Sequence, residues 1–559
     1  MDDVDAVQAQ IARNMLQSGD WVTAHLDGIP YLEKAPLKYW LIAASFVIFG
    51  VHDWAARLPI ALGVIALCLV TRRMARWALG EPAGLYAGLT LATCIGLFLF
   101  TRVLIPDAIL TLTITLALWS LLRALDAAEA HPGRWAMSFW ASMAAGVLLK
   151  GLIAMLFPLG AAGVWLLLTG QWRLQQTWSR LRPWSGMLLF LLIAAPWHIA
   201  ATLANPPYFD FTMHSESGSY RGFFWFYFIN EHILRFLNLR YPRDYNTVPR
   251  PLFWLLHAIW FFPWTGYLAA TAHMAFRGDD RACRTRLLAL CWIGFVMLFF
   301  TFSTTQEYYS LPCYPAVALL LGASLASGLP WLRVVTRVTA VVAGLAGVVI
   351  AAILALVWNQ PAPGDISRAL SQNPEIYTLS LGHASDLTIS AMAYLKAPLA
   401  LAGLAAVVGC LGAWWGKGRA QYLALAVMMV LFFHAARLAL VAFDPYMGSR
   451  PLAEAIRRGP PGQLIVDDQY YAFSSVFFYT NQNAFLLNGR KNNIEYGSYA
   501  PGAPAVFLND AGFVDKWDQP SRCYLVADKH ELERFRGLVG ASKLHLLADS
   551  GGKFAATNN

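Results

Sequence analysis

The sequence predicts a mainly α-helical protein that crosses a membrane many times and ends in a small α/β domain. Of its 559 residues, 57% are hydrophobic and 13% are charged, whereas soluble domains carry about 25% charged residues. Long apolar runs alternate with short loops from residue 55 to residue 441, and the composition turns polar after Phe443. We therefore expect a membrane domain over residues 1–443 and an extramembrane domain over 444–559.

About twelve apolar runs have the length and composition of membrane-spanning helices. No internal repeat interrupts them. They lie at 55–71, 83–101, 107–123, 135–150, 152–169, 185–203, 252–274, 287–303, 310–327, 334–358, 389–414 and 420–441.

Basic residues gather in alternate loops, which the positive-inside rule assigns to the cytoplasm. This assignment places residues 1–54, the segment 204–251 and the C-terminal region on the outer face. Because the acids at the start must then reach that face, we expect a further apolar helix of about 20 residues upstream of Met1. The net charge of +9 reflects these loops and does not indicate nucleic-acid binding. The basic residues are Arg72, Arg73, Arg76, Arg123, Arg134, Arg173, Arg180, Arg182, Arg277, Arg281, Arg284, Arg286, Arg333, Arg337, Lys417 and Arg419.

Two outer segments are aromatic-rich but too short to span. Leu37–Val51 and Phe223–Leu239 are therefore expected to lie in the membrane interface. In the C-terminal region, the apolar runs LIVDD, CYLVAD and LHLLAD alternate with helix-like segments at 450–458 and 529–538, which indicates a small α/β domain. The seven cysteines are scattered and form no C-x-x-C pair, so we expect core residues and no zinc site or disulfide framework.

The stretch from Met1 to Trp40 concentrates charge just ahead of the first apolar run. Asp2, Asp3 and Asp5 precede a helix-like segment, and the pair Glu33-Lys34 precedes Pro36. Acids also suit the first turn of a helix, where they interact with free N–H groups. An adjacent Glu-Lys pair at a surface contributes little. These structural interpretations stand beside a functional one.

The functional interpretation comes from a resemblance. The acidic start, IARNML, SGDWV and EKAPL occur in an order that resembles the polytopic glycosyltransferases using polyprenyl-phosphate sugars. These include the protein O-mannosyltransferases and, more closely, the lipid A aminoarabinose transferases. The resemblance covers roughly the N-terminal three fifths of the chain. It departs at Ala35, where the family commonly has proline.

This resemblance implies a GT-C-type glycosyltransferase fold with an outer cavity, in a bacterial inner membrane with its active site on the periplasmic face. The donor would be a sugar on undecaprenyl or another polyprenyl phosphate. The acceptor would be a lipid, a glycan or a protein, and one-step transfer would invert the anomeric centre. Whether a divalent metal takes part stays open.

The resemblance also assigns catalytic carboxylates. The family's Asp-Glu pair aligns with Val4 and Asp5, so both Asp3 and Asp5 are candidates for the base that takes the acceptor proton. Glu33 of EKAPL and Asp107 of RVLIPDAILTL match further acids. Asp107 after Pro106 is also an ordinary helix start, although an ionisable group at a membrane face usually serves a site.

Three cations are implied to bind the donor phosphate: Lys34, Lys150 and Arg235. Lys150-Gly151 matches the family's K-G-P turn, whereas a lysine at a helix end can also simply reach the interface. Arg235 belongs to an N-E-H-x-x-R-F segment that the family places beside the donor pocket. The same segment would form an ordinary i,i+4 pair with Glu231.

The remaining pocket residues implied are Glu231, His232, Glu307, Tyr308 and Tyr309. Relatives often carry a lysine before the two tyrosines, where this chain has Glu307. Together with the dense acids at the start, this change favours a hydroxyl acceptor over a lipid A phosphate, because acids repel an anion.

Two other classes of protein explain part of this pattern. A sugar or lipid transporter or flippase with a periplasmic binding domain would also place charges in a membrane cavity, but it predicts inverted repeats and broken helices at mid-membrane. A simple membrane anchor for the C-terminal domain would give Asp107 and Lys150 no common purpose. The charges of this chain gather at one face, which favours the transferase.

The alternation of basic loops generates a topology prediction. Alkaline phosphatase fused after Gly551 should be active, because that position is expected outside, and a fusion after Arg76 should be inactive. Enzyme activity of cells carrying each fusion measures this. The reverse pattern would overturn the whole topology.

Overall fold

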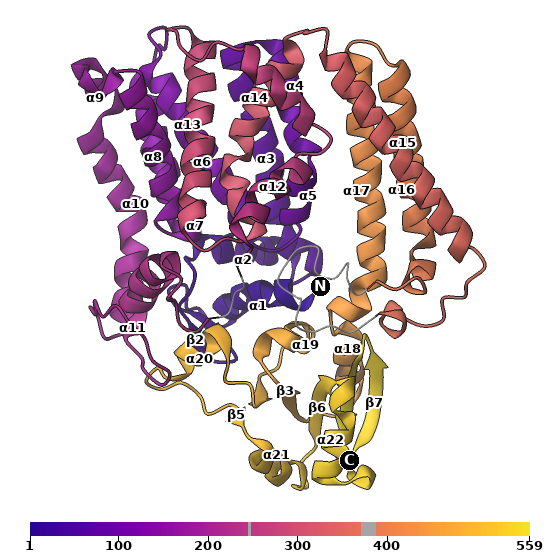
Figure 1. Cartoon of the computed structure of the whole chain (residues 1–559). Helices are drawn as coiled ribbons and strands as arrows, with labels where there is room; N and C mark the ends of the chain where they lie inside the picture. Colours follow the sequence, from indigo (N-terminus) through magenta and orange to yellow (C-terminus); the bar gives the residue numbers. More distant parts are fainter. Residues whose placement is uncertain (244–246, 371–386) are drawn as a thin grey trace.

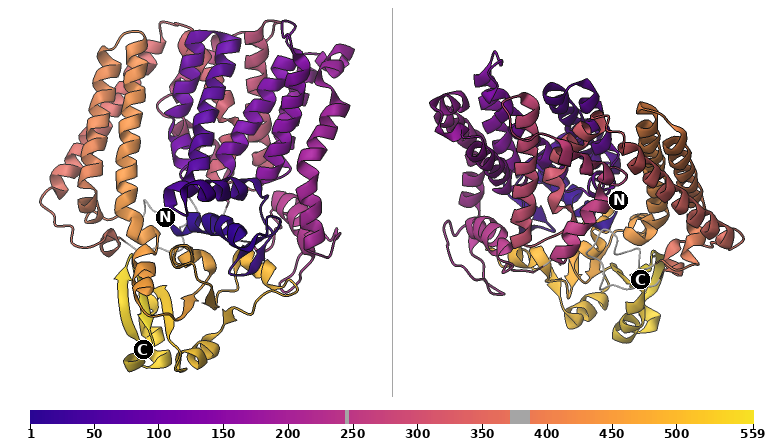
Figure 2. Two further views of the ribbon diagram at one scale, coloured as in Figure 1. Left: turned by 180° about the vertical axis from the view of Figure 1, so that it is seen from behind. Right: turned by 45° about the horizontal axis from the view of Figure 1, so that its top comes forward.

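The computed structural model describes residues 1–243, 247–370 and 387–559. Figure 1 shows three layers: a bundle of long helices, a thin layer holding α1 (Asp3–Ser18) and α2 (Leu37–Phe49), and a C-terminal α/β domain. Figure 2, which adds a view from behind, shows the thin layer between the other two. The N-terminus lies in this middle layer.

Within the described residues, eight helical segments are long and apolar enough to cross a membrane. The chain is therefore a multi-pass membrane protein. The segments are Asp53–Leu79 (α3), Asp107–Leu125 (α6), Gln175–Ala204 (α9 and α10), Arg281–Phe302 (α13), Glu307–Ala326 (η4 and α14), Leu332–Val357 (α15), Ala391–Trp415 (η8 and α16) and Arg419–Met447 (α17).

The other four apolar runs are also helical but shorter, broken or less apolar. The run at 83–101 is split into α4 (Glu81–Ala92) and α5 (Ile95–Phe100). The runs at 135–150 and 152–169 form α7 (Pro132–Lys150) and α8 (Ile153–Leu168). The run at 252–274 bends by 93° between α12 (Arg250–Trp260) and η3 (Thr265–His273). Pro263 lies in this break, where its missing N–H cannot continue a helix.

The loops follow the expected alternation. Figure 1 places α9 (Gln175–Leu181) and the junctions α3–α4, α14–α15 and α16–α17 at the end of the bundle away from the C-terminal domain. These are junctions in which the sequence gathers its arginines and lysines. The acidic start of the chain lies at the opposite end.

The two segments expected in the interface are helical. Leu37–Val51 forms α2, which runs crosswise beneath the bundle in Figure 1. Phe223–Leu239 contains the end of α11 (Gly222–Phe224) and a π-helix, η2, from Trp225 to Leu234. A π-helix is rare and occurs mostly at functional sites.

The C-terminal domain is built on a six-stranded sheet of order β5-β4-β3-β6-β8-β7. Strands β3, β4, β5 and β6 are parallel, whereas β8 pairs antiparallel with β6 and β7. This confirms the predicted α/β fold. The strands are Gln463–Asp467 (β3), Ala484–Leu487 (β4), Phe507–Leu508 (β5), Cys523–Asp528 (β6), His545–Ser550 (β7) and Lys553–Thr557 (β8); the helices are Arg450–Arg458 (α18), Ser474–Thr480 (α19), Asn492–Ser498 (α20), Asp510–Trp517 (α21) and Leu532–Val539 (α22).

The C-terminal domain packs on the middle layer through one apolar core. Val7 and Ile11 of α1 and Tyr39 of α2 belong to the same buried cluster as Val466 and Phe477. Burial of such side chains contributes about 1.5–3 kcal/mol each. The contact therefore fixes the domain against the membrane part.

A second contact joins α20 to a short hairpin, β1 (Ala24–Leu26) with β2 (Ile29–Tyr31). Gly497 of α20 lies so close to this hairpin that a Cβ atom there would be 1.9 Å from the carbonyl oxygen of Pro30. Only glycine permits this approach of two backbones.

Gly497→Ala should therefore destabilise the protein by about 1–3 kcal/mol, the usual cost of overpacking. The apparent melting temperature of the purified protein measures this. Gly537→Ala is the matched control, because a Cβ atom at Gly537 in α22 meets nothing within 4 Å. An equal loss in both variants would contradict the proposed close contact.

Candidate functional site

A cavity of about 410 Å³ opens at the lower end of the bundle and brings together most of the predicted site residues. Its charged and aromatic lining comes from the link after β2, the start of α6, the end of α7, η2 and η4. These residues are Glu33, Lys34, Asp107, Lys150, Glu231, His232, Arg235, Tyr308 and Tyr309. Apolar side chains complete the wall: Ile153, Leu156, Ile233, Phe236 and Phe299.

The buried carboxylate of Glu33 is the centre of the polar part. It accepts a hydrogen bond from the Tyr31 hydroxyl at 2.6 Å and pairs with Lys34, with Arg235 at 3.7 Å and with Arg240 at 4.0 Å. Burial alone would raise the pKa of Glu33, but the neighbouring Lys34, Arg240 and Arg235 hold it well below its usual range. Glu33 is therefore a fixed negative charge.

Asp107 and Lys150 form a second ion pair, with 2.5 Å between Nζ and Oδ1. The Lys150 ammonium also lies 5.2 Å from the ring centre of Tyr308 and 5.3 Å from that of Tyr309. These contacts hold Lys150 in place at the end of α7, directly before the turn to α8. Among the described residues, the buried Asp107 Oδ2 has no hydrogen-bond partner.

The π-helix η2 contributes Glu231, His232 and, directly after it, Arg235. Arg235 Nη1 lies 2.8 Å from Glu231, and Arg235 Nη2 donates to the Tyr309 hydroxyl at 3.0 Å. The fully buried Arg240 pairs with the same Glu231. Arg235 is thus held in place before any ligand binds.

His232 is a neutral positioning residue. Its Nε2 accepts a hydrogen bond from the backbone N–H of Leu152 at 3.0 Å, so its Nδ1 carries the proton and donates to the Tyr227 carbonyl at 2.5 Å. Burial lowers the pKa of His232. Gly151 permits this contact, because its φ is +86° and a Cβ atom there would lie 2.3 Å from His232 Nε2. The histidine therefore fixes the α7–α8 turn that presents Lys150.

The structure does not bring the N-terminal aspartates into the cavity. Asp3 pairs with Lys553 of the C-terminal domain at 2.7 Å and accepts from the Ser475 N–H at 2.8 Å. Asp5 pairs with Arg57 and accepts from the Leu104 N–H at 2.6 Å. Burial, with the nearby Asp2, raises the pKa of Asp5 to about 7. Asp5 thus supports the loop that leads to Asp107, and its catalytic role stays a prediction.

Glu307 is the third predicted residue that is not among the residues lining the cavity. It is buried at the start of η4 (Glu307–Cys313), directly before Tyr308 and Tyr309. The tyrosines do line the cavity. The role of Glu307 in the pocket and its effect on the acceptor stay a prediction.

Four residues of the network were not predicted: Tyr31, Lys38, Arg240 and Asn493. The Asn493 amide lies in the C-terminal domain and donates to Glu33 while accepting from Arg240. Lys38 is buried, bonds to Gln8 and donates to the Leu104 carbonyl at 3.2 Å. Lys38 follows Lys34 by four residues, and this spacing could have identified it as a neighbour of the site. No sequence pattern links Asn493 to Glu33.

No group of three or more His, Cys, Asp or Glu side chains suited to a metal ion occurs in the described part of the chain. The acids of the cavity instead pair with lysine and arginine. Charge within the cavity is therefore balanced by side chains of the protein itself.

The fold and the cavity define a polytopic membrane protein with the GT-C type of fold. Two crystal structures of ArnT from Cupriavidus metallidurans have the same fold, one bound to undecaprenyl phosphate and one in the apo state. Their TM-scores are 0.77 and 0.76, at 21% identity, and the match covers 100% of this chain and 93% of theirs. The predicted fold class is confirmed.

Relatives with similar sequences point the same way. Residues 33–199 match the family described as dolichyl-phosphate-mannose-protein mannosyltransferase. Undecaprenyl phosphate-alpha-4-amino-4-deoxy-L-arabinose arabinosyl transferase of Aeromonas salmonicida is 29% identical over 63% of this chain and 61% of its own length. The same-named protein of Pseudomonas aeruginosa is 30% identical over 57% and 54%. The match thus spans little more than half of each relative, and the predicted resemblance to glycosyltransferases using polyprenyl-phosphate sugars is confirmed.

The buried pairing of Arg240 generates a stability prediction. Arg240→Gln leaves Glu231 and Glu33 with one cation fewer, and removing one partner of a buried pair typically costs about 3–5 kcal/mol. We expect a clearly lower apparent melting temperature. Arg243→Gln is the control, because Arg243 is exposed; equal melting temperatures for the two variants would contradict the prediction.

Proposed function

We propose that the chain transfers a sugar from a polyprenyl phosphate to an acceptor at the periplasmic face of a bacterial inner membrane. The observation that carries this proposal is that one cavity is lined both by three cations and by apolar side chains. The cations are Lys34, Lys150 and Arg235. A lipid phosphate has the same two parts, an anion and a hydrocarbon chain. The undecaprenyl phosphate bound by the ArnT structure of the same fold supports this choice of donor.

The cations supply what the reaction needs. When the sugar leaves, negative charge grows on the phosphate, and cations fixed in advance stabilise it without reorganising. Lys150 and Arg235 are held by Asp107 and Glu231, at 2.5 Å and 2.8 Å. A bound phosphate would share these cations with the carboxylates through charge-assisted hydrogen bonds.

The apolar wall accommodates the polyprenyl chain. Leu156 and Ile233 are exposed residues of the wall, beside Phe236 and Phe299. An isoprenoid chain would cover this surface while its phosphate meets the cations. We propose the same cavity end, next to Tyr308 and Asp107, for the sugar and the acceptor.

A hydroxyl acceptor needs a base. Asp107 lines the cavity and has a carboxylate oxygen without a hydrogen-bond partner among the described residues. Asp5 lies behind the loop that carries Leu104 and Asp107. We propose Asp107 as the group that meets the acceptor and Asp5 as the acid that keeps this loop in place.

Variants of the site test this assignment. We expect Lys34→Ala and Asp107→Asn each to lower the transfer rate at least about a hundredfold, the scale for losing a stabilising charge or a base. We expect a comparable loss in Asp5→Asn, because the loop that leads to Asp107 loses its carboxylate support. Asp3→Asn is the contrasting variant: since Asp3 pairs with Lys553 at 2.7 Å, we expect a lower melting temperature and a smaller loss of rate. Initial rates of purified, folded variants measure this. Wild-type rates in Lys34→Ala and Asp107→Asn would leave those residues a structural role only, and a wild-type rate in Asp5→Asn would contradict its support of the loop.

The acceptor is tested by a matched assay. The purified full chain, in detergent or vesicles with an undecaprenyl phosphate sugar, is offered one lipid acceptor in phosphorylated and dephosphorylated form. We expect transfer to a hydroxyl of both forms, because the lining cations Lys34, Lys150 and Arg235 are already shared between the carboxylates of the cavity and the donor phosphate. Transfer that requires the acceptor phosphate would overturn the hydroxyl assignment. Donor movement across vesicles without any transfer would favour a transporter instead.

A further inference from the structure

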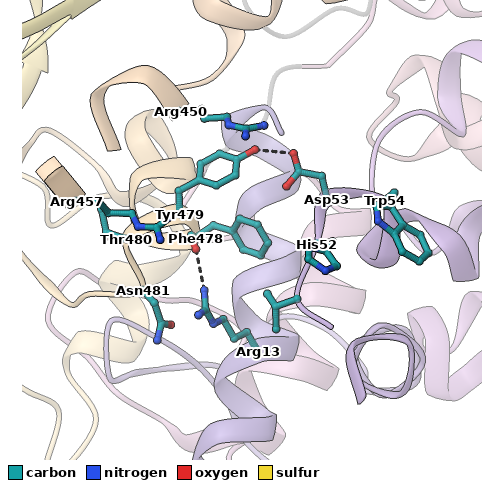
Figure 3. A pocket seen from close by; sticks show the side chains of 11 residues that line it. Arg13, His52, Asp53, Trp54, Arg450, Arg457, Phe478, Tyr479, Thr480 and Asn481 are labelled. Carbon is teal, nitrogen blue, oxygen red and sulfur yellow. Dashed lines mark hydrogen bonds between the residues drawn. The ribbon is translucent and has the colours of Figure 1, made fainter. Parts of the chain in front are cut away.

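A second cavity, of about 570 Å³, lies at the seam between the middle layer and the C-terminal domain (Figure 3). Its walls are Arg13 of α1, residues 51–54 at the end of the α2–α3 link and the start of α3, and residues of α18 and of the segment 478–481. It shares no lining residue with the donor cavity. The proposed transfer reaction leaves it without a role.

Positive charge dominates this cavity. Arg13, Arg450 and Arg457 line it, and Asp53 is the single carboxylate among the described lining residues. Arg450 pairs with Glu454 at 2.8 Å, a residue outside the cavity lining. The other two arginines, Arg13 and Arg457, line a space in which a bound anion would neutralise their charge.

Arg13 is the arginine held most firmly. Its Nη1 donates to the Phe478 carbonyl at 2.9 Å (Figure 3), and its buried Nε has no hydrogen-bond partner among the described residues. Burial, followed by the positive charge of Arg457, lowers the pKa of Arg13. Arg13 and Arg457 thus both line this cavity, close enough for the charge of Arg457 to act on Arg13.

Exposed apolar side chains lie next to the cavity lining. Trp54, which lines the cavity, exposes 54% of its surface, and its ring centre lies 5.3 Å from that of Phe49 at the end of α2, where Val47 and Ile48 expose 70% and 71%. Val51 also lines the cavity. Exposed apolar side chains next to a tryptophan are typical of a surface at the membrane interface. The cavity therefore joins a cationic interior to a membrane-facing rim.

We propose that this cavity binds the phosphate-bearing headgroup of an anionic membrane lipid, with the acyl chains lying against the rim of α2. Arginine is suited to this task, because its fork of N–H donors matches phosphate oxygens. A free phosphate shares the headgroup chemistry, but it would leave Val47, Ile48 and Trp54 uncovered. The lipid would bind across the seam and join the membrane part to the C-terminal domain.

The test is a titration of the purified full chain followed by native mass spectrometry. Phosphatidylglycerol and phosphatidylcholine with the same acyl chains are added separately, and inorganic phosphate is added alone as the third arm. We expect wild type to prefer phosphatidylglycerol. Arg457→Gln should weaken this binding about fivefold, the effect expected for one cation near an anionic lipid, and Arg450→Gln with Arg457→Gln should weaken it further.

Arg458→Gln is the matched control. Arg458 is next to Arg457 on α18, but it lies outside the cavity, and its side chain is 82% exposed. We expect unchanged lipid binding, and the melting temperature of each variant checks that it is folded. Equal binding of the two lipids to wild type, or equal loss in Arg457→Gln and Arg458→Gln, would overturn the proposal. Binding of inorganic phosphate that is lost in Arg457→Gln, without preference for phosphatidylglycerol, would replace the lipid by a soluble anion.

Discussion

The structure of the donor cavity depends on one buried carboxylate, that of Glu33. A buried negative charge is costly unless cations and hydrogen-bond donors surround it. Here Tyr31, Lys34, Arg235, Arg240 and Asn493 meet it. These groups come from β2 with its following link, the region around η2, and the C-terminal domain. Satisfying a single charge therefore brings these three distant parts of the chain to one place.

Local pairs within this network were predictable from sequence, because their partners are adjacent in the chain or one helical turn apart. Glu33-Lys34 and the i,i+4 pair Glu231–Arg235 are of this kind, and both are formed. Asp107 and Lys150 are 43 residues apart, and their meeting followed from the resemblance, not from spacing. The contact of Asn493 with Glu33 could not be predicted, because nothing local records where α20 packs.

The same contrast holds for the fold. Apolar length predicted the helices, since a membrane requires internally satisfied backbones. It did not reveal the break between α4 and α5 or the 93° bend after α12, which depend on packing. The N-terminal aspartates show the limit most clearly. Their charge pattern predicts a reaction centre, whereas the structure shows Asp3 in an ion pair with Lys553 and Asp5 in an ion pair with Arg57. Their catalytic role stays a prediction.

Asn493 has a consequence for how the protein is made. Ribosomes deliver this residue after every helix of the bundle, so the hydrogen bonds that join Glu33 and Arg240 to Asn493 form only when the last domain has been synthesised and folded. A chain halted before that moment would hold its membrane helices but lack this part of the network around Glu33. During biogenesis the membrane helices are therefore present before the network around Glu33 is complete.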